Sequence, residues 1–254
     1  MPSIHPSAWV DSGVKVPDSA TVGPFAVVEE GAEIGESVTV GPHAVVHGSA
    51  TLHDGVRVGA HAVLGADPQS LGFDPEVRTR VVIGARSVLR EGATVSRATG
   101  DEPTRVGADC LLMGQVHIGH DCVLGDGVVV SQGAGLAGHV TVGEGAVIGG
   151  MAGVHQHVRV GRLAMVGGAA VVTRDVPPFL VAMGKPARLA QINRLALTRA
   201  GVDDARQRAV RRVFLALQNR APAEAEGAAD PLAAELLTFW SSAGGRGTTA
   251  FLRG

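Results

Sequence analysis

The side chains best suited to chemistry are five histidines between residues 117 and 157, namely His117, His120, His139, His155 and His157. Asp121 directly follows His120, which places a carboxylate next to an imidazole. A neutral imidazole beside a carboxylate is the arrangement expected of a general base. This group therefore predicts acid–base catalysis with His120 and Asp121 at its centre.

Two other interpretations of the histidines compete with catalysis. Exposed histidines are common in turns, and five more occur elsewhere in the chain: His5, His43, His47, His53 and His61. Three imidazoles could also bind Zn²⁺. Hexapeptide carbonic anhydrases use a His-x4-His pair and a distant histidine, whereas the pair here is His117-x2-His120. We favour the general base, and we expect neither a metal nor a cofactor.

An aliphatic residue at every sixth position indicates which elements position these side chains. The pattern fills 26 hexapeptides in three runs, from Ile4 to Leu64, from Ile83 to Val95 and from Val106 to Val172. A small residue usually follows the aliphatic by four positions, as Ala134 follows Val130. This is the signature of a hexapeptide-repeat parallel β-helix.

In such a helix each hexapeptide supplies a short strand and a tight corner, so three of them make one 18-residue coil. The repeats of this chain then make about nine coils. Residues 18 apart lie above one another. Asp121, His139 and His157 are therefore expected to form one column, and His120, Gly138 and Gln156 the column beside it. The spacing predicts that the histidines gather on an outer face.

Two segments break the six-residue register, at about residues 66–82 and 96–105. Long excursions from a regular solenoid usually line a binding site or an interface. We expect these loops to contribute to the functional site, and a neutral surface insertion is the alternative.

The repeat is expected to end near Pro177 and Pro178, because consecutive prolines interrupt strand pairing. Beyond Pro186 the apolar residues adopt helical spacing. That spacing is carried by Leu189, Ile192, Leu195, Val210, Val213, Phe214, Leu217, Leu232, Leu236 and Trp240. Helix starts are predicted at Asp203-Asp204 and at Asp230-Pro231. We expect two domains, a mainly β domain at 1–185 and a small α-helical domain at 186–254.

Composition agrees with this architecture. The 254 residues are 45% hydrophobic, 18% charged and only 3% aromatic, as expected for a stack of Val, Ile, Leu and Ala. The start of the chain lacks a basic and then apolar leader, and no apolar run reaches 18 residues. These features predict a cytoplasmic protein without stable membrane insertion. Cys110 and Cys122 occupy the small-residue position and are predicted to be core thiols.

Several strings are more specific than the repeat: His117-Ile118-Gly119-His120-Asp121-Cys122, Leu136-Ala137-Gly138-His139, Val154-His155-Gln156 and Met165-Val166-Gly167-Gly168. Through them the chain resembles the UDP-N-acetylglucosamine O-acyltransferase family of lipid A biosynthesis over nearly its whole length. The resemblance implies a left-handed β-helix and a homotrimer. It also implies transfer of a 3-hydroxyacyl chain from acyl carrier protein to the 3-position of UDP-N-acetylglucosamine.

By matching position, the resemblance implies that His120 is the general base, that Asp121 orients it, and that the Gly138 N–H stabilises the oxyanion. The implied substrate-binding residues are Gln69, His117, His139, His155, Gln156, Asn193 and Arg199. Met165 and Gly168 are expected to border the acyl-chain groove, where Gly168 favours a long chain. Acidic acyl carrier protein is expected to dock at the basic residues Arg206, Arg208, Arg211 and Arg212.

The first loop departs from the family pattern. Many members carry Gln-Asp-Leu-Lys-Tyr, in which the Asp contacts the acceptor sugar and the Lys its phosphates. This chain carries Gln69-Ser70-Leu71-Gly72-Phe73. The acceptor is therefore open between UDP-N-acetylglucosamine and a related nucleotide such as a 3-amino analogue.

Two further functions are compatible with the repeat. One is an acetyl-CoA-dependent N-acetyltransferase acting on a sugar nucleotide, and the other is a non-catalytic β-helix scaffold. The clustered histidines disfavour the scaffold, and the basic tail disfavours the acetyl-CoA enzyme. No nucleic-acid partner is expected.

Overall fold

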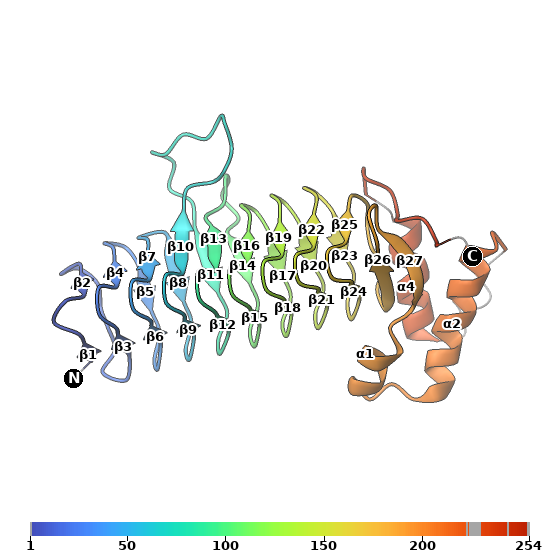
Figure 1. Ribbon diagram of the computed structural model, residues 1–254, viewed down its shortest axis with the longest axis horizontal. Helices are drawn as coiled ribbons and strands as arrows, with labels where there is room; N and C mark the ends of the chain where they lie inside the picture. Colours follow the sequence, from blue (N-terminus) through green and yellow to red (C-terminus); the bar gives the residue numbers. More distant parts are fainter. Residues whose placement is uncertain (1, 222, 224–229, 243, 253–254) are drawn as a thin grey trace.

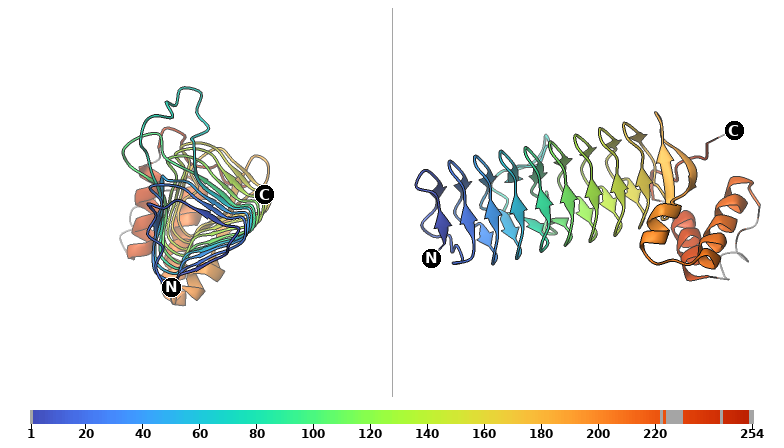
Figure 2. Two further views of the ribbon diagram at one scale, coloured as in Figure 1. Left: turned by 90° about the vertical axis from the view of Figure 1, so that its left-hand side faces the viewer. Right: turned by 60° about the horizontal axis from the view of Figure 1, so that its bottom comes forward.

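The computed structural model describes residues 2–221, 223, 230–242 and 244–252, and shows a long prism followed by a small group of helices (Figure 1). Along its axis the prism is triangular, with one sheet on each side (Figure 2). Strands from successive coils pair in parallel. Outside the loops the pairing joins residues 18 apart, as Thr21 pairs with Thr39, except at the last coil, where Met165 pairs with Val181. The parallel β-helix predicted from the six-residue period is confirmed.

The three sides are called sheets A, B and C. Sheet A contains β1 (Ser3–Ile4), β3 (Thr21–Val22), β6 (Thr39–Val40), β9 (Arg57–Val58), β12 (Val88–Leu89), β15 (Leu111–Leu112), β18 (Val129–Val130), β21 (Val147–Ile148), β24 (Met165–Val166), β26 (Leu180–Met183) and β27 (Arg188–Ile192). Sheet B contains β2 (Trp9–Val10), β4 (Val27–Val28), β7 (Val45–Val46), β10 (Val63–Ala66), β13 (Thr94–Ser96), β16 (His117–Ile118), β19 (Gly135–Leu136), β22 (Gly153–Val154) and β25 (Val171–Val172). Sheet C contains β5 (Glu33–Ile34), β8 (Ala50–Leu52), β11 (Val81–Ile83), β14 (Thr104–Val106), β17 (Val123–Leu124), β20 (Thr141–Val142) and β23 (Arg159–Val160).

The sixth-position aliphatics form the core of the prism. Ile118, Leu136 and Val154, from consecutive coils of sheet B, are all buried. Each such side chain contributes about 1.5–3 kcal/mol to folding through the hydrophobic effect, so stability is distributed along the axis. Cys110 and Cys122 are buried free thiols among these residues, as predicted.

The corner between sheets B and C carries the predicted histidine column. Asp121, His139 and His157 each occupy the left-handed backbone region, with φ of 58°, 62° and 63°. Aspartate and histidine are among the non-glycine residues most often found in this region. The rings of His139 and His157 stack with centroids 4.5 Å apart, so the 18-residue spacing located this column correctly.

Both register breaks leave the prism at this same corner. The first loop, residues 67–80, connects β10 of sheet B to β11 of sheet C, and projects well beyond the prism (Figure 1). The second loop, residues 97–103, connects β13 of sheet B to β14 of sheet C. The topology therefore places both loops beside the histidine column.

The end of the prism differs from the prediction in two respects. Pro177 and Pro178 do not end the strand ladder, because Val176 bridges to Val160 and β26 pairs in parallel with β24. Residues 188–192, expected to be helical, form β27, which pairs antiparallel with β26. A β-bulge leaves Ala190 without a partner, so Leu189 and Ile192 are both buried although they are three residues apart. The bulge therefore mimics helical spacing in the sequence.

The helical part begins directly after β27. It comprises α1 (Arg194–Arg199), α2 (Asp204–Gln218) and α4 (Pro231–Ser241). The side chains of Asp203 and Asp230 accept hydrogen bonds from the first turns of α2 and α4, so both predicted helix starts are confirmed. Within the described residues, no helix is both long and apolar enough to span a membrane.

Candidate active site

The histidines lie on three successive coils of sheet B and on the corner that follows it. The side chain of His117 projects from β16, and His120 and Asp121 follow two and three residues after that strand. His139 takes the corner position one coil further. The stacking of successive coils therefore brings these side chains together.

His120 and Asp121 form a hydrogen-bonded pair. The distance from His120 Nδ1 to Asp121 Oδ2 is 2.7 Å, and the two side chains are 16% and 14% exposed. Burial favours a raised pKa for the Asp121 carboxyl, but hydrogen bonds from His120 and Thr99 outweigh it and lower the pKa. Asp121 is therefore a carboxylate at neutral pH, and it holds a proton on His120 Nδ1 when the imidazole is neutral.

Gly138 leaves room for the other nitrogen of this imidazole. A Cβ at Gly138 would lie 2.4 Å from His120 Cε1 and 2.6 Å from Nε2. The Nε2 lone pair can approach a substrate only because this side chain is absent. The N–H of Gly138 has no hydrogen-bond acceptor within the described residues, so this donor is free for a ligand.

His117 and His139 surround the pair. His117 Nδ1 lies 2.8 Å from Thr94 Oγ1, and burial lowers the pKa of His117. His139 Nε2 lies 3.5 Å from Asp121 Oδ2, and its ring meets that of His120 edge-on. Burial is also the main cause of the lowered pKa of His139. Both imidazoles are therefore neutral at neutral pH.

The side chains that could hold a metal ion are not the three imidazoles considered from the sequence, but two imidazoles and a carboxylate. Potential ligand atoms of His120, Asp121 and His139 all lie within 4.8 Å of one another. However, both oxygens of Asp121 already accept hydrogen bonds from Thr99, at 2.9 and 2.7 Å. The carboxylate is thus occupied within the protein, which favours an orienting role over metal coordination.

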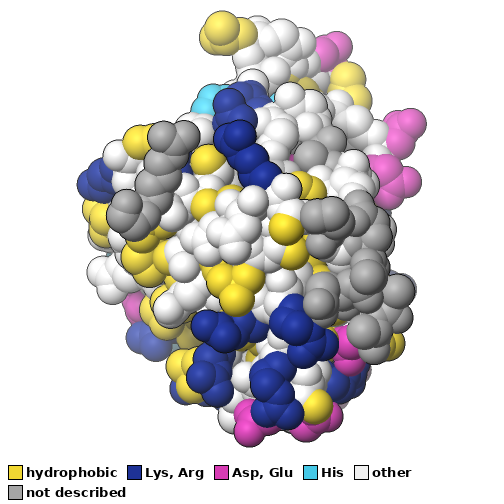
Figure 3. Space-filling model, turned by 90° about the vertical axis from the view of Figure 1, so that its right-hand side faces the viewer, with side chains coloured by type: hydrophobic (Ala, Val, Ile, Leu, Met, Phe, Trp, Pro, Cys, Tyr) yellow, Lys and Arg dark blue, Asp and Glu magenta, His cyan; other side chains and the backbone are white. Residues whose placement is uncertain are grey.

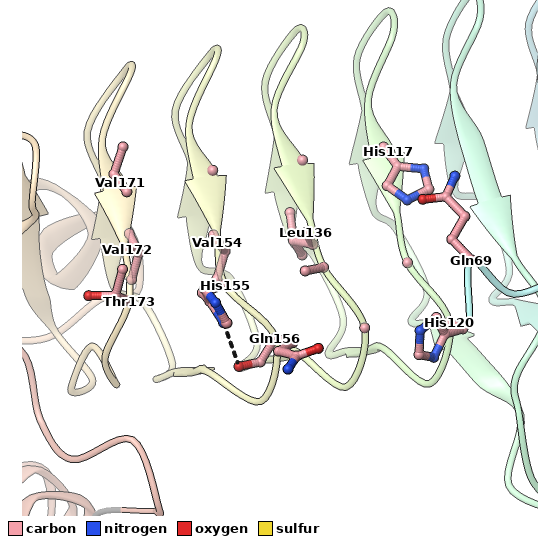
Figure 4. Close-up of a pocket in the computed structure, with 15 residues that line it drawn as sticks. Gln69, His117, His120, Leu136, Val154, His155, Gln156, Val171, Val172 and Thr173 are labelled. Carbon is pink, nitrogen blue, oxygen red and sulfur yellow. Dashed lines mark hydrogen bonds between the residues drawn. The ribbon is translucent and has the colours of Figure 1, made fainter. Parts of the chain in front are cut away.

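A cavity of about 500 Å³ opens in front of His120 (Figure 4). It is lined by Gln69, His117, Gly119, His120, Gly135, Leu136, Ala137, Gly138, Gly153, Val154, His155, Gln156, Val171, Val172 and Thr173. Gly135 and Gly153 form a floor without side chains, since a Cβ at either position would meet nothing within 4 Å. The cavity thus combines a basic imidazole, amide groups and an apolar floor.

Most of the predicted site residues meet at this cavity. Gln69, His117, His120, Gly138, His155 and Gln156 line it, and Asp121 and His139 stand behind His120. In Figure 4 the side chain of Gln69 reaches from the first loop toward His117. Thr99, which fixes Asp121, and Thr173 were not predicted. Thr99 lies in the interrupted register and carries no spacing signal.

The remaining predicted residues lie elsewhere. Asn193 and Met165 line a second, largely apolar cavity of about 620 Å³ between sheet A and the helices. The Asn193 side chain caps α1 and donates to the Leu163 carbonyl. Arg199 is exposed at the end of α1, and Gly168 is exposed with space for a Cβ. The structure thus does not bring Asn193, Arg199, Met165 and Gly168 to the His120 cavity within one chain.

The histidines outside the 117–157 group include two that contact each other. His43 and His61 stack with centroids 4.9 Å apart, and Phe25 stacks on His43 at 5.0 Å. These histidines therefore form their own ladder in the first coils, without a carboxylate partner comparable to Asp121.

Both the sequence and the fold are similar to those of known acyltransferases. Residues 31–66 and 103–138 match the bacterial transferase hexapeptide family, and residues 175–249 match the second domain of UDP-N-acetylglucosamine O-acyltransferase. The structure of UDP-N-acetylglucosamine acyltransferase from Campylobacter jejuni superimposes with a TM-score of 0.90 and 30% identity, over 98% of this chain and 100% of that one. The fold is therefore the left-handed parallel β-helix of the hexapeptide acyltransferases, as expected.

Two similar sequences share one description, that of an acyltransferase acting on UDP-N-acetylglucosamine. The acyl-[acyl-carrier-protein]–UDP-N-acetylglucosamine O-acyltransferase of Aliivibrio fischeri is 43% identical over 84% of this chain and 82% of its own length. The protein of the same description from Gloeothece citriformis is 41% identical over 59% of this chain and 55% of its own length. This chain belongs to the UDP-N-acetylglucosamine O-acyltransferase family, and it is an acyltransferase.

Proposed function

We propose that the protein transfers a 3-hydroxyacyl chain from acyl carrier protein to the 3-hydroxyl of UDP-N-acetylglucosamine, the first step of lipid A biosynthesis. The observation that carries this proposal is the His120–Asp121 pair, whose free imidazole nitrogen adjoins Gly138 at an open cavity. Family membership defines the reaction, and the pair supplies the base that it needs.

In the proposed reaction, His120 Nε2 removes the proton from the sugar hydroxyl as its oxygen attacks the thioester carbonyl. The C–O bond forms and the carbonyl oxygen becomes an oxyanion, which the free N–H of Gly138 stabilises. The tetrahedral intermediate then collapses, the C–S bond breaks, and the protonated His120 returns its proton to the leaving thiolate. Asp121 remains ionised and stabilises the imidazolium.

No side chain of the protein needs to act as a nucleophile in this scheme. The nearest thiol, Cys122, is buried and donates to the Ala137 carbonyl, and burial raises its pKa to about 12. A thiolate is therefore absent at neutral pH. Direct attack by the sugar oxygen is consistent with this environment.

For the acceptor, we propose contacts from Gln69, His117, His139, His155 and Gln156. Four of these line the cavity, and His139 lies behind His120, with its Nε2 3.5 Å from Asp121 Oδ2. Asn193 and Arg199 are proposed to contact the nucleotide from the helical end of the molecule. The capping role of Asn193 leaves one of its amide hydrogens for this contact.

We propose a homotrimer from the character of the three prism sides. The outer face of sheet A is aliphatic in its second half, at Leu111, Val129, Val147 and Met165. The outer face of sheet B is apolar in its first half, at Trp9, Val27, Val45 and Val63. Sheet C carries polar residues such as Glu33, Arg105 and Arg159. Packing of sheet A on sheet B of the next subunit is a heterologous contact that closes as a ring.

The proposed donor is acyl carrier protein, docked by charge at the helical end. Figure 3 shows lysine and arginine side chains gathered on this end. Arg208, Arg211 and Arg212 are exposed on α2, as the sequence suggested. Arg206 differs, because its guanidinium bonds to Asp230 at 2.9 Å and is partly neutralised. A cytoplasmic location is proposed because acyl carrier protein and sugar nucleotides are cytoplasmic substrates.

The alternative acceptor is a related amino-sugar nucleotide. It is favoured by Ser70 and Gly72, which offer no charge at the two loop positions where many relatives carry Asp and Lys. Incubation with UDP-N-acetylglucosamine and a panel of acyl carrier protein and CoA thioesters, followed by mass spectrometry, tests both proposals. We expect an O-acylated product from the carrier-protein donor. An N-acylated product from a 3-amino acceptor alone, or transfer from acetyl-CoA alone, would contradict the proposed substrates.

A further inference from the structure

Residues 67–79 of the first loop are hydrogen-bonded to the rest of the protein through one side chain, that of Arg97. Arg97, at the start of the second loop, bonds through Nε to Asp67 Oδ1 at 2.9 Å. Its two terminal nitrogens donate to the carbonyls of Val77 at 2.6 Å and Pro75 at 2.8 Å. The guanidinium also lies over the Phe73 ring, 4.8 Å from its centroid. One arginine thus contacts the beginning, the middle and the end of the loop.

The last residue of the loop, Arg80, is held separately, because its carbonyl accepts hydrogen bonds from the N–H groups of Ala98 and Thr104. The remaining hydrogen bonds of residues 67–79 join the loop to itself, as between Ser70 and Pro68 or between Glu76 and Asp74. Within the described part of the chain, every hydrogen bond from residues 67–79 to the rest of the protein is made by Arg97. The Arg97 side chain is only 11% exposed, whereas the side chain of its partner Asp67 is 61% exposed.

The same short segment also fixes the catalytic carboxylate. Two residues after Arg97, the N–H and hydroxyl of Thr99 donate to the two oxygens of Asp121. At the other end of the segment, Thr104 Oγ1 accepts a hydrogen bond from the Asp121 N–H at 2.8 Å. The second loop therefore contacts the first loop on one side and the His120–Asp121 pair on the other.

We propose that Arg97 is a positioning residue for acyl transfer, which holds Gln69 at a defined place relative to His120. Gln69 follows Asp67 by two residues and is the one residue of the first loop that lines the cavity. Arg97 acts on substrate through Gln69 and touches neither the substrate nor the reacting atoms. This inference rests on the proposed function, since it assigns Gln69 to substrate binding there.

A double-mutant cycle between Arg97 and Gln69 tests this directly. Displacement of a substrate-binding group by about 1 Å can cost up to 10²-fold in rate. We expect Arg97→Ala to lower kcat/KM with UDP-N-acetylglucosamine by about tenfold or more. In a Gln69→Ala background, the same change should cost less than about twofold. Arg97→Lys, which keeps the charge for Asp67 but cannot bond both carbonyls, should give an intermediate loss.

Two further measurements separate positioning from a general loss of structure. Hydrogen exchange of residues 67–79 should accelerate in Arg97→Ala, while the coils of the prism keep their protection. The pH profile of kcat/KM should keep its shape, because Arg97 does not contact Asp121. Arg86→Ala is the matched control, since it removes an exposed ion pair with Asp109 on another corner and should leave kcat/KM within about twofold.

The outcomes distinguish this inference from the proposed function. If losses from Arg97→Ala and Gln69→Ala multiply, or if loop exchange is unchanged, Arg97 does not act through Gln69 and the inference is wrong. If Arg97→Ala does not fold, Arg97→Lys replaces it in the same cycle. If the wild-type protein transfers no acyl group, the proposed function fails, and the exchange experiment still reports whether Arg97 holds the loop.

Discussion

His120 is oriented by residues from two different segments of the chain. Asp121 holds its Nδ1, and Thr99 of the second loop holds Asp121. The opposite nitrogen adjoins Gly138, one coil away. The proposed base therefore depends on a hydrogen-bonded carboxylate on one side and on the absence of a side chain on the other.

Gly138→Ala tests the second of these requirements. The new Cβ would lie 2.6 Å from His120 Nε2, so the imidazole must rotate away from its position against Asp121. We expect kcat to fall by about 10²-fold, because the base is misplaced. Circular dichroism should show an unchanged fold, since the obstructing atoms belong to a side chain that can move. Undiminished kcat in Gly138→Ala would show that this imidazole is not the base.

The half-buried His117 predicts how stability depends on pH. The pKa of His117 is lowered by burial, whereas an imidazole in the unfolded chain has a pKa of about 6.5. As pH falls through that value, the unfolded chain binds a proton that the folded chain does not, so stability is lost toward acid pH. The effect is absent above that range, where both states are neutral.

His117→Gln removes this contribution. We expect the fall in Tm between about pH 7.5 and about pH 5 to be smaller in His117→Gln than in the wild type. His53→Gln, at an exposed histidine of a distant coil, is the control and should retain the wild-type dependence. Equal losses of Tm in all three proteins would refute the assignment.

The regular spacing of strands and corners was predictable from the sequence, and the irregular contacts between loops were not. The 18-residue period placed Asp121, His139 and His157 in one column, because every coil adds the same rise and rotation. The bond between Arg97 and Asp67 joins residues 30 positions apart in two different loops, and no repeat in the sequence predicts it. Sequence reasoning could therefore name the two loops as candidates but could not say how they are held.

The error at β27 has a similar origin. Leu189 and Ile192 are three residues apart, which fits a helix as well as a bulged strand. Antiparallel pairing with β26 decides between them, and that pairing is a tertiary contact. The helices that begin with Asp203 and Asp230 were predictable because their caps are local in sequence.

Gly168, in the turn after β24 of sheet A, is the residue expected to set the length of the transferred acyl chain. Gly168 is exposed, and a Cβ there would meet only the Gly150 carbonyl at 3.5 Å, so a larger residue fits without disturbing the coil. If the acyl chain passes this point, Gly168→Met should reduce transfer of long 3-hydroxyacyl donors while short donors are transferred as well or better. The measurement is kcat/KM for carrier-protein donors of graded length. The same length profile in both proteins would exclude Gly168 as the ruler.

At the scale of the whole molecule, the unequal faces of the prism predict assembly. Light scattering should give three times the chain mass of 25.8 kDa. Val147→Glu places a charge on the aliphatic face of sheet A and should dissociate the assembly, because a buried unpaired charge is costly. Thr141→Glu on the exposed face of sheet C is the matched control and should remain assembled. A fully active wild-type monomer at about micromolar concentration would refute the trimer.

We propose that the protein, as a trimer, transfers an acyl group to a sugar nucleotide with His120 as the base. The most direct test of this proposal compares wild type with His120→Ala, using a 3-hydroxyacyl carrier-protein donor and UDP-N-acetylglucosamine, with mass spectrometry of the product. We predict O-acylated UDP-N-acetylglucosamine from the wild type, and a kcat lower by about 10²-fold or more in a folded, assembled His120→Ala. Wild-type turnover in His120→Ala, or no acylated nucleotide from the wild type, would contradict the account.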